Sequence, residues 1–474
     1  MSSYNKKKIG FVVFVIIIVI VVVAVISTSK SDVGTSPPPS PPGDEGDEGD
    51  EGDSSMDSSQ IFSSPLSTEL NPNDVQIIEE GRTSYTFDWN PTTQIEVDDN
   101  GCVFVAYRQF GEPPPRGGGF VPGLVLAFLS NEDPPSAVAR TSEDVWKFFP
   151  LDQEMVVNLG QSLFPGALAL SRGGSRGSCA TATVAYAPAA RDRVGVATLT
   201  SDATWNVSEV TNTSPSSPGF NGSVYFVALE ASTAGLYLCL PSSGDTVLLL
   251  FLPAGDSQWT VVAEIDPSPS LSTRNVALAV VDDAIFVSLL NSAELYLYQV
   301  DTGGDEHQLL LRQPGQTDVT ASPLLAADLN GVVVGAVFVE EESSSRIRLW
   351  EIGYGGQPVF SYPSILARAT PLGAALSITS GEVIVSAIRS AEKKTVEGSL
   401  QRWEAPVSFG FLFATSERPS GDSKSLEWSL TPVNVPGPHG SIASAVAFPW
   451  VFISLMETGK EHSELKIVKV DLRA

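Results

Sequence analysis

The segment ALAVV-DDA-IFVSL, residues Ala277–Leu289, decides the fold, because it reads as two short apolar strands joined by a polar turn. The same pattern recurs as LLAAD-LNG-VVVGA at Leu324–Ala336 and as ALSIT-SGE-VIVSA at Ala375–Ala387. From about Arg82 onward no segment of any length has helical periodicity, so the sequence predicts an all-β fold. The second strands of the seven copies begin at Val103, Ala182, Leu236, Ile285, Val332, Val383 and Val451.

A column of small residues runs through these hairpins at the fourth position of each second strand. Its members are Ala106, Ala185, Cys239, Ser288, Gly335, Ser386 and Ser454. Sheets that converge on one axis need small side chains where neighbouring sheets press together. A polar turn followed by a Trp-bearing strand also recurs, at Trp146, Trp205, Trp259 and Trp428. Units of about 50 residues with four strands are typical of propeller blades. We therefore expect a seven-bladed β-propeller over residues 82–474, with a pair of two-sheet sandwiches as the alternative.

Closure of the ring needs one more strand, because the last unit supplies only three before the chain ends. The segment SYTFDW, Ser84–Trp89, ends in the same Trp-strand pattern. We expect it to complete the last blade and to tie the two ends of the ring together. The Trp residues are then expected to pack on outer strands rather than to serve as sugar-stacking platforms.

The N-terminal region predicts a membrane anchor. Residues Ile9–Ile26 form an uncharged run rich in Val and Ile, preceded by Lys6, Lys7 and Lys8. At about 1.5 Å per residue the run spans roughly 27 Å, enough to cross the bilayer core. The positive-inside rule then predicts a cytoplasmic tail at residues 1–8 and an extracellular or lumenal C-terminal domain. The alternative is a cleaved signal peptide, whose apolar core is usually shorter.

Residues 27–81 are expected to form a disordered stalk. They contain SPPPSPP at Ser36–Pro42 and GDEGDEGDEGD at Gly43–Asp53, and neither segment can bury a core. The whole chain has 55 acidic and 28 basic residues and a net charge of −27. Phosphate groups would be repelled by such a protein, so no nucleic-acid partner is expected.

The unit Leu372–Glu404, LGAALSITSGEVIVSAIRSAEKKTVEGSLQRWE, resembles an FG-GAP repeat of the kind that builds the integrin α-chain propeller. Members of that family that bind calcium do so in loops of DxDxDG type. The turns at Asp98–Gly101, Asp282–Asp283 and Asp328–Gly331 are too short for an ion that needs six or more oxygen ligands. The family's metal sites are therefore not expected here. Fungal fucose-binding lectins, which are propellers with Trp-bearing blades, are a second and purely architectural resemblance.

No catalytic site can be assigned from the sequence. His307, His439 and His462 lie in different units without paired spacing, and acidic residues are too plentiful to select the carboxylate pair of a glycosidase. No metal and no cofactor are expected. Enzymatic activity is left open but is less favoured than binding.

Candidate binding residues come from two long connections between second and third strands. These are Gln109–Gly123 in the first unit and Ser390–Gly398 in the sixth. Long loops on a rigid scaffold tend to carry function, and Arg108, Arg116 and Arg389 would provide basic groups there on an acidic surface. The alternative is that they are ordinary arginines of solvated loops.

Three sequons and three cysteines complete the candidate features. The glycosylation acceptors are Asn206, Asn212 and Asn221. Cys239 belongs to the small-residue column and is expected to be a buried free thiol. Cys102 and Cys179 lie in turns of adjacent hairpins, where blades are usually too far apart for a disulfide, so their pairing is disfavoured but left open.

Together these features predict a single-pass membrane protein that presents a propeller for recognition or adhesion at a surface. Its expected partners are the membrane, through residues 9–26, and an extracellular protein or glycan. The alternatives are a carbohydrate-specific propeller lectin and a membrane-anchored propeller glycosidase. Propellers host many functions, so the fold by itself does not choose among them.

Overall fold

The computed structural model describes the chain in segments that all belong to one compact unit, residues 54–474. The described segments are 75–81, 93–97, 102–110, 122–129, 146–151, 168–172, 182–186, 193–200, 204–211, 227–241, 246–266, 275–282, 284–291, 293–301, 307–315, 317, 323–339, 344–353, 359–368, 373–388, 392–397, 402–407, 410–419, 426–435, 439–457 and 463–472. Within these segments every regular element is a β-strand, and none contains a helix able to cross a membrane. The expected tail and anchor, residues 1–26, lie outside them.

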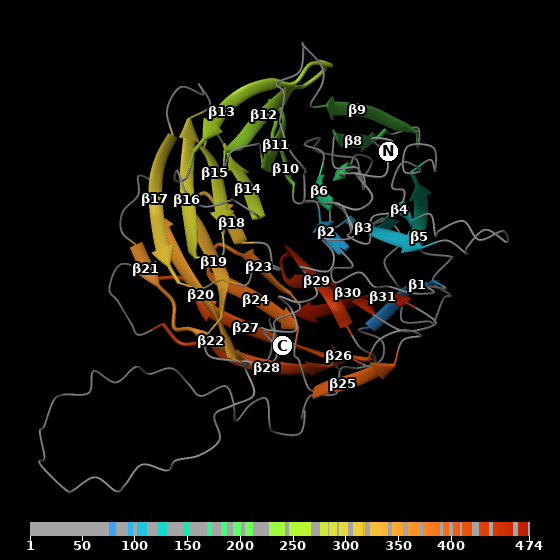
Figure 1. Ribbon diagram of the computed structural model, residues 1–474, viewed down its shortest axis with the longest axis vertical. Coiled ribbons are helices and arrows are strands. Elements are labelled where there is room, and N and C mark those ends of the chain that lie inside the picture. The colour runs from blue at the N-terminus through green and yellow to red at the C-terminus, as the bar shows by residue number, and fades with distance from the viewer. Residues whose placement is uncertain are drawn as a thin grey trace, which may run out of the picture. The chain divides into compact units, whose positions relative to one another are not determined.

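The strands form seven antiparallel sheets of four or five strands, which we call blades 1 to 7 in chain order (Figure 1). Blade 1 consists of β2 (Thr93–Val97), β3 (Val103–Phe110), β4 (Pro122–Leu129) and β5 (Trp146–Pro150). Blade 2 consists of β6 (Leu168–Arg172), β7 (Ala182–Tyr186), β8 (Arg193–Leu199) and β9 (Trp205–Thr211). Blade 3 consists of β10 (Ala228–Ala231), β11 (Gly235–Pro241), β12 (Val247–Pro253) and β13 (Thr260–Ile265). Blade 4 consists of β14 (Asn275–Val281), β15 (Ala284–Leu290), β16 (Glu294–Asp301) and β17 (His307–Pro314).

The remaining three blades each carry a variation on the four-stranded plan. Blade 5 consists of β18 (Leu324–Asp328), β19 (Gly331–Val339), β20 (Ser344–Gly353), β21 (Val359–Ser361) and β22 (Ile365–Arg368). Blade 6 consists of β23 (Ala374–Ile378), β24 (Glu382–Ile388), β27 (Gly410–Glu417) and β28 (Ser429–Asn434), with β25 (Glu392–Glu397) and β26 (Arg402–Val407) as a separate pair. Blade 7 consists of β29 (His439–Ala447), β30 (Trp450–Glu457), β31 (Ser463–Asp471) and β1 (Val75–Gly81).

The blades are arranged in a closed ring. Their first strands contact one another in the cyclic order β2, β6, β10, β14, β18, β23, β29 and back to β2. Seven apolar clusters fill the interfaces, and each is built from two neighbouring blades. The described residues thus form a propeller-like all-β fold, whose core lies between the sheets rather than inside one of them. The alternative of two separate sandwiches is wrong.

All seven predicted hairpins are present. The second strands β3 and β7 begin at the predicted residue, and the other five begin one residue earlier. The seven members of the small-residue column are all buried. At Gly335 the limit on size comes from the neighbouring strand of the same blade. A Cβ atom added there would lie 2.3 Å from the side chain of Leu349 and 2.4 Å from the carbonyl oxygen of Arg348, both in β20.

The strand that closes the ring is not the one expected. β1, residues Val75–Gly81, pairs antiparallel with β31 as the fourth strand of blade 7, with Val75 opposite Val468. The segment Ser84–Trp89, which we expected in this position, lies outside the described residues. β1 has the apolar–polar sequence VQIIEEG and falls within the range 27–81 that composition assigned to the stalk. The chain-end closure was therefore anticipated, but its residues were not.

The Trp residues mark the outer strands, as predicted. Trp146 and Trp205 begin the fourth strands β5 and β9, and Trp259 and Trp428 immediately precede the fourth strands β13 and β28. Trp259 and Trp428 are buried, and Trp428 Nε1–H donates to the carbonyl oxygen of Pro363 at 2.7 Å. Trp205 is half-buried against the cluster between blades 1 and 2. These three side chains therefore pack the scaffold and are not open platforms.

The two cysteines that the structure describes are in different oxidation states. Cys239 is a buried free thiol, as expected, and burial raises the pKa of this thiol well above its ordinary value. Cys102 is disulfide-bonded, contrary to our expectation for its position. Cys102 is fully buried in the cluster that joins blade 1 to Ala182 of blade 2, so the two blades approach closely at this end. Cys179, the one other cysteine of the chain, lies outside the described residues.

Candidate functional site

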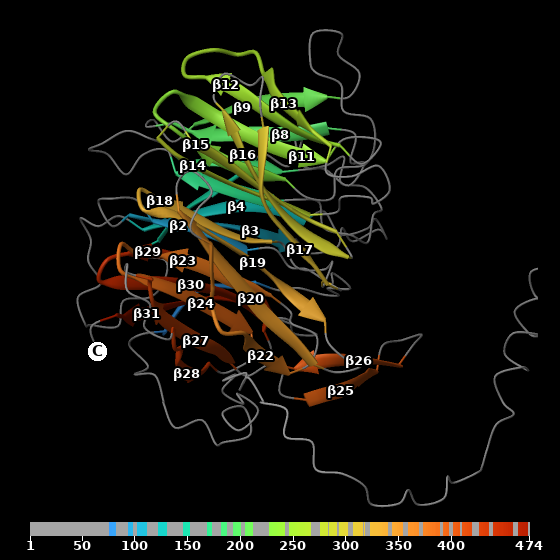
Figure 2. The same cartoon turned by 90° about the vertical axis from the view of Figure 1, so that its left-hand side faces the viewer.

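The alternation of strand direction gives the ring two different faces. One face carries the connections from first to second and from third to fourth strands, and we call it the turn face. The opposite face carries the connections from second to third strands and from one blade to the next, and we call it the insertion face. Figure 2 shows the ring from the side, with the pair β25–β26 beyond the blades on the side toward which β13 and β17 run.

The most distinctive element of the insertion face is the ribbon formed by β25 and β26. It lies between the second strand β24 and the third strand β27 of blade 6, and these two strands pair with each other directly. Among the described residues the ribbon pairs with none of the seven blades. An isolated two-stranded ribbon is only marginally stable in water.

This ribbon corrects our expectation for blade 6. The sequence predicted a loop at Ser390–Gly398 followed by a third strand in the region of QRWE, as the FG-GAP resemblance implies. Instead Arg402–Val407 is the second strand of the ribbon, and Gly410–Glu417 is the third strand of the blade. The insertion is therefore longer than predicted and has regular structure of its own. Sequence alone did not separate the two strands because both have the alternating pattern of a blade strand.

The backbone register of the ribbon is antiparallel and regular. Glu392 is paired with Val407 at one end, Val396 with Trp403 and Glu397 with Arg402 at the other. The strand β25 has the sequence EKKTVE and the strand β26 has the sequence RWEAPV.

The predicted binding arginines all belong to the insertion face by their position in the chain. Arg108 lies near the end of β3, opposite Leu124 of β4. Arg116 and Arg389 lie outside the described residues, as does most of the predicted loop Gln109–Gly123. The structure therefore assigns Arg108 to a strand end, and it leaves the grouping of the three arginines as a prediction.

A second polar group on the insertion face lies in blade 4. At the turn between β15 and β16, Asn291 Oδ1 accepts hydrogen bonds from the backbone N–H groups of Ala293 and Glu294, each at 2.8 Å. Glu294 Oε1 accepts hydrogen bonds from Arg312 Nε at 3.1 Å and from Nη2 at 2.7 Å, and Glu294 Oε2 accepts one from the Tyr296 hydroxyl. The hydrogen bond from Arg312 holds the pKa of Glu294 below its ordinary value. Both acceptor oxygens are occupied, so this group fixes a turn.

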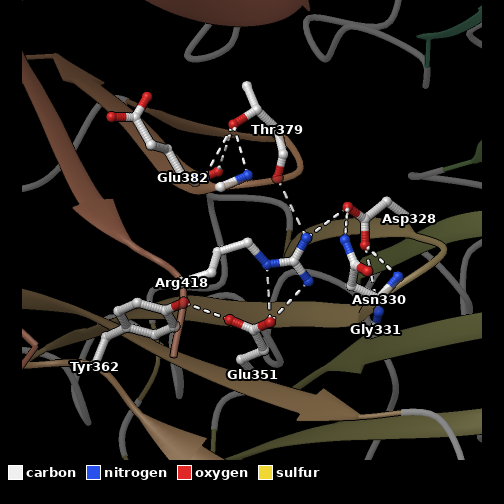
Figure 3. Close-up of polar contacts among 9 residues, drawn as sticks. Asp328, Asn330, Gly331, Glu351, Tyr362, Thr379, Glu382 and Arg418 are labelled. Carbon is white, nitrogen blue, oxygen red and sulfur yellow. Dashed lines mark hydrogen bonds and ion pairs between the residues drawn. The ribbon is translucent and has the colours of Figure 1, made fainter. Parts of the chain in front are cut away.

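The turn face carries a different kind of polar group, centred on Arg418 between blades 5 and 6 (Figure 3). Arg418 Nε donates to Glu351 Oε1 at 2.9 Å, and Nη2 lies 2.7 Å from the same oxygen. Nη1 donates to Asp328 Oδ2 at 2.5 Å and to the carbonyl oxygen of Thr379 at 3.2 Å. Tyr362 donates its hydroxyl hydrogen to Glu351 Oε2. We call these five residues the clasp.

The centre of the clasp is buried. The side chains of Arg418 and Glu351 are 6% and 9% exposed, Tyr362 is 3% exposed, and Asp328 at the margin is 27% exposed. Burial alone would lower the pKa of Arg418, but its hydrogen bonds to the two carboxylates outweigh burial and raise the pKa. Burial, followed by the hydrogen bond to Glu351, raises the pKa of Tyr362. These contacts join blades 5 and 6.

Asp328 also stabilises the acidic turn Asp328–Gly331. Its Oδ1 accepts the backbone N–H groups of Asn330 at 2.9 Å and Gly331 at 3.3 Å, while Oδ2 receives Arg418. The carboxylate therefore supports a hairpin turn, as the sequence analysis proposed for these Asx residues. In the neighbouring blade, Asp282 has a φ of 50°, a left-handed conformation that a tight hairpin turn requires.

Sequence reasoning missed the clasp. Arg418 follows the apolar strand β27, and Glu351 lies between Trp350 and Ile352 in β20. A carboxylate within such an apolar strand is the one available signal, because a charge buried there needs a partner. The partner itself is 67 residues away in the sequence, and no local pattern identifies it.

Comparison with known proteins finds distant likenesses among solved structures alone. No family model matches, FG-GAP included, and no curated protein matches. Among solved structures, a polysaccharide lyase is similar at 10% identity and a TM-score of 0.47, covering 80% of this chain and 89% of the other. A chain of the mitotic checkpoint complex is similar at 9% identity and a TM-score of 0.44, covering 93% and 99%. A Trypanosoma rangeli sialidase is similar at 10% identity and a TM-score of 0.38, covering 64% and 53%.

These likenesses do not extend to function, because every TM-score is below 0.5 and every identity is near 10%. The assignment to the propeller-like class rests on the sheets and interfaces of this chain. The FG-GAP resemblance is supported only to that extent, as a repeated all-β architecture.

Proposed function

We propose that this chain is a membrane-anchored extracellular propeller that recognises a protein or glycan ligand at a surface, and that its insertion face binds the ligand. The observation that carries the proposal is the ribbon β25–β26. It is an ordered insertion that none of the blades needs for its own pairing among the described residues. Binding residues in propellers and other rigid scaffolds are concentrated on such insertions, while the scaffold provides stability.

The ribbon is poorly suited to recognition by addition of a further strand. β25 contains Lys393 and Lys394, and β26 contains Pro406, which has no N–H to donate, and these residue types oppose pairing with another strand. β26 also contains Trp403, and Trp is enriched in recognition surfaces.

The disulfide bond of Cys102 supports an extracellular or lumenal location. Disulfides persist in oxidising compartments and are rare in the cytosol. The lysines at positions 6–8 favour the same topology, with the N-terminus in the cytosol. The net charge of −27 opposes nucleic acid and anionic lipid as ligands.

A glycan-array screen of the soluble ectodomain, Ser67–Ala474, tests the proposal when it is run with and without calcium. Saturable binding to a narrow set of sugars supports recognition of a glycan, and calcium dependence overturns our rejection of metal sites. Crosslinking of the same ectodomain to intact cell surfaces tests for a protein ligand. The absence of saturable binding in both experiments contradicts the proposed function.

A further inference from the structure

Asn206 is the one predicted glycosylation acceptor that falls within the described residues, and its position is informative. It lies in β9, the outermost strand of blade 2, opposite Thr198 of β8. Its side chain is exposed, whereas Trp205 and Val207 on either side pack against the cluster between blades 1 and 2. Asn206 therefore belongs to the outer surface of the ring, and Ser208 of the same sequon is half-exposed.

The strand that carries Asn206 is also an edge strand. Among the described residues β9 pairs only with β8, so one row of its backbone N–H and C=O groups is left without a sheet partner. Such an edge is a template for pairing with another chain unless it is blocked. β9 has seven residues and no Pro or Lys, the residues that usually block an edge.

We propose that Asn206 is N-glycosylated and that its glycan covers the free edge of blade 2. In this modification the side-chain amide nitrogen of Asn206 bonds to the anomeric carbon of a lipid-linked oligosaccharide diphosphate. The amide nitrogen loses one proton and the lipid diphosphate leaves. The product is a bulky, hydrophilic group on an outer strand, which no second strand can approach closely. The inference rests on the proposed extracellular location, because the transfer occurs on the lumenal side of the membrane.

The outer strands of the next three blades provide the contrast. β13, β17 and β21 expose one aliphatic residue each, namely Val261, Leu309 and Val359. No sequon occurs in these strands. A glycan on β9 would thus make the rim of blade 2 sterically and chemically different from the rim of blades 3 to 5, and would exclude blade 2 from lateral contacts.

The experiment expresses the full chain in a eukaryotic secretory cell and measures glycan occupancy by mass spectrometry after enzymatic release. We expect Asn206→Gln and Ser208→Ala each to remove one glycan, and Ser208→Thr to retain it. The matched control is the double variant with Asn212→Gln and Asn221→Gln, which keeps the Asn206 glycan. We also expect Asn206→Gln to form more soluble aggregate than the control at equal concentration.

The outcomes separate this inference from the proposed location. If Asn206 is unmodified while another sequon is occupied or Cys102 is oxidised, the location stands and the glycan on β9 is refuted. If no sequon is occupied and Cys102 is reduced, both the location and the glycan are refuted. If Asn206 is modified but its loss leaves aggregation unchanged, the edge-covering role is refuted.

Discussion

The two faces of the ring differ in structure, although both are formed by the ends of the same repeated hairpins. On the turn face the connections between first and second strands of blades 3 to 7 have only two or three residues, and side-chain caps such as Asp328 and Thr379 hold them. The clasp around Arg418 then joins two of these turns across the interface of blades 5 and 6. On the insertion face the connection in blade 6 expands into a separate ribbon. The difference indicates that the turn face stabilises the ring, and that the insertion face is free to vary and to bind.

The largest predicted effect is the loss of the clasp. Arg418→Ala leaves Glu351 and Asp328 without their cation, and breaking a buried ion pair in this way costs about 3–5 kcal/mol of unfolding free energy. The matched variant Arg312→Ala, on the insertion face, removes an ion pair whose arginine is exposed, so a much smaller loss of stability is expected. Urea unfolding followed by Trp fluorescence measures both.

If Arg418→Ala fails to fold, the double variant with Arg418→Met and Glu351→Gln provides the second measurement. It removes both buried charges of the closest pair, and it is expected to be more stable than Arg418→Met alone. Equal stability of Arg418→Ala and the wild type would contradict the stabilising role of the turn face.

The second largest loss of stability is expected at Gly335 of the small-residue column, and the turn residue Gly381 provides the control. Gly335→Ala puts a Cβ atom 2.3 Å from Leu349 and 2.4 Å from a backbone oxygen, and overpacking of this kind costs about 1–3 kcal/mol. The control Gly381→Ala has no heavy atom within 4 Å of the added Cβ, so we expect a change within about 0.5 kcal/mol. Thermal unfolding of the two variants decides whether a residue without a Cβ atom is required where β19 pairs with β20.

A smaller effect comes from Glu294 on the insertion face. Its pKa is lowered in the folded state, so its contribution to stability is present above the unfolded-state pKa and is lost as the pH falls through the folded-state pKa. Glu294→Gln removes this dependence, at a cost of about 0–1 kcal/mol at neutral pH, because Arg312 is exposed. Unfolding midpoints of wild type and variant between neutral and acidic pH are expected to converge as the pH falls.

The sequence predicted the repeated parts of the molecule well and the unique parts poorly. Local sequence patterns predicted the seven hairpins, the small-residue column and the outer strands that begin near Trp residues. These patterns are local because a strand that packs against the next blade needs apolar residues at regular positions. β1 was missed because its partner β31 lies nearly 400 residues away, and pairing between chain ends leaves no local signal. The ribbon was missed because its strands resemble blade strands in pattern. The clasp was missed because its members come from five separate segments.

Replacement of the ribbon tests the division between the two faces most directly. Ile388 of β24 pairs with Phe411 of β27, so residues 389–410 can be replaced by a two-residue Asn-Gly turn without changing the register of blade 6. The measurement compares wild type and replacement for saturable binding to the ligand found in the array or crosslinking screen, and for the urea unfolding midpoint. We predict an unchanged midpoint and the loss of binding. Retained binding at the wild-type affinity, or collapse of the fold, would contradict the account.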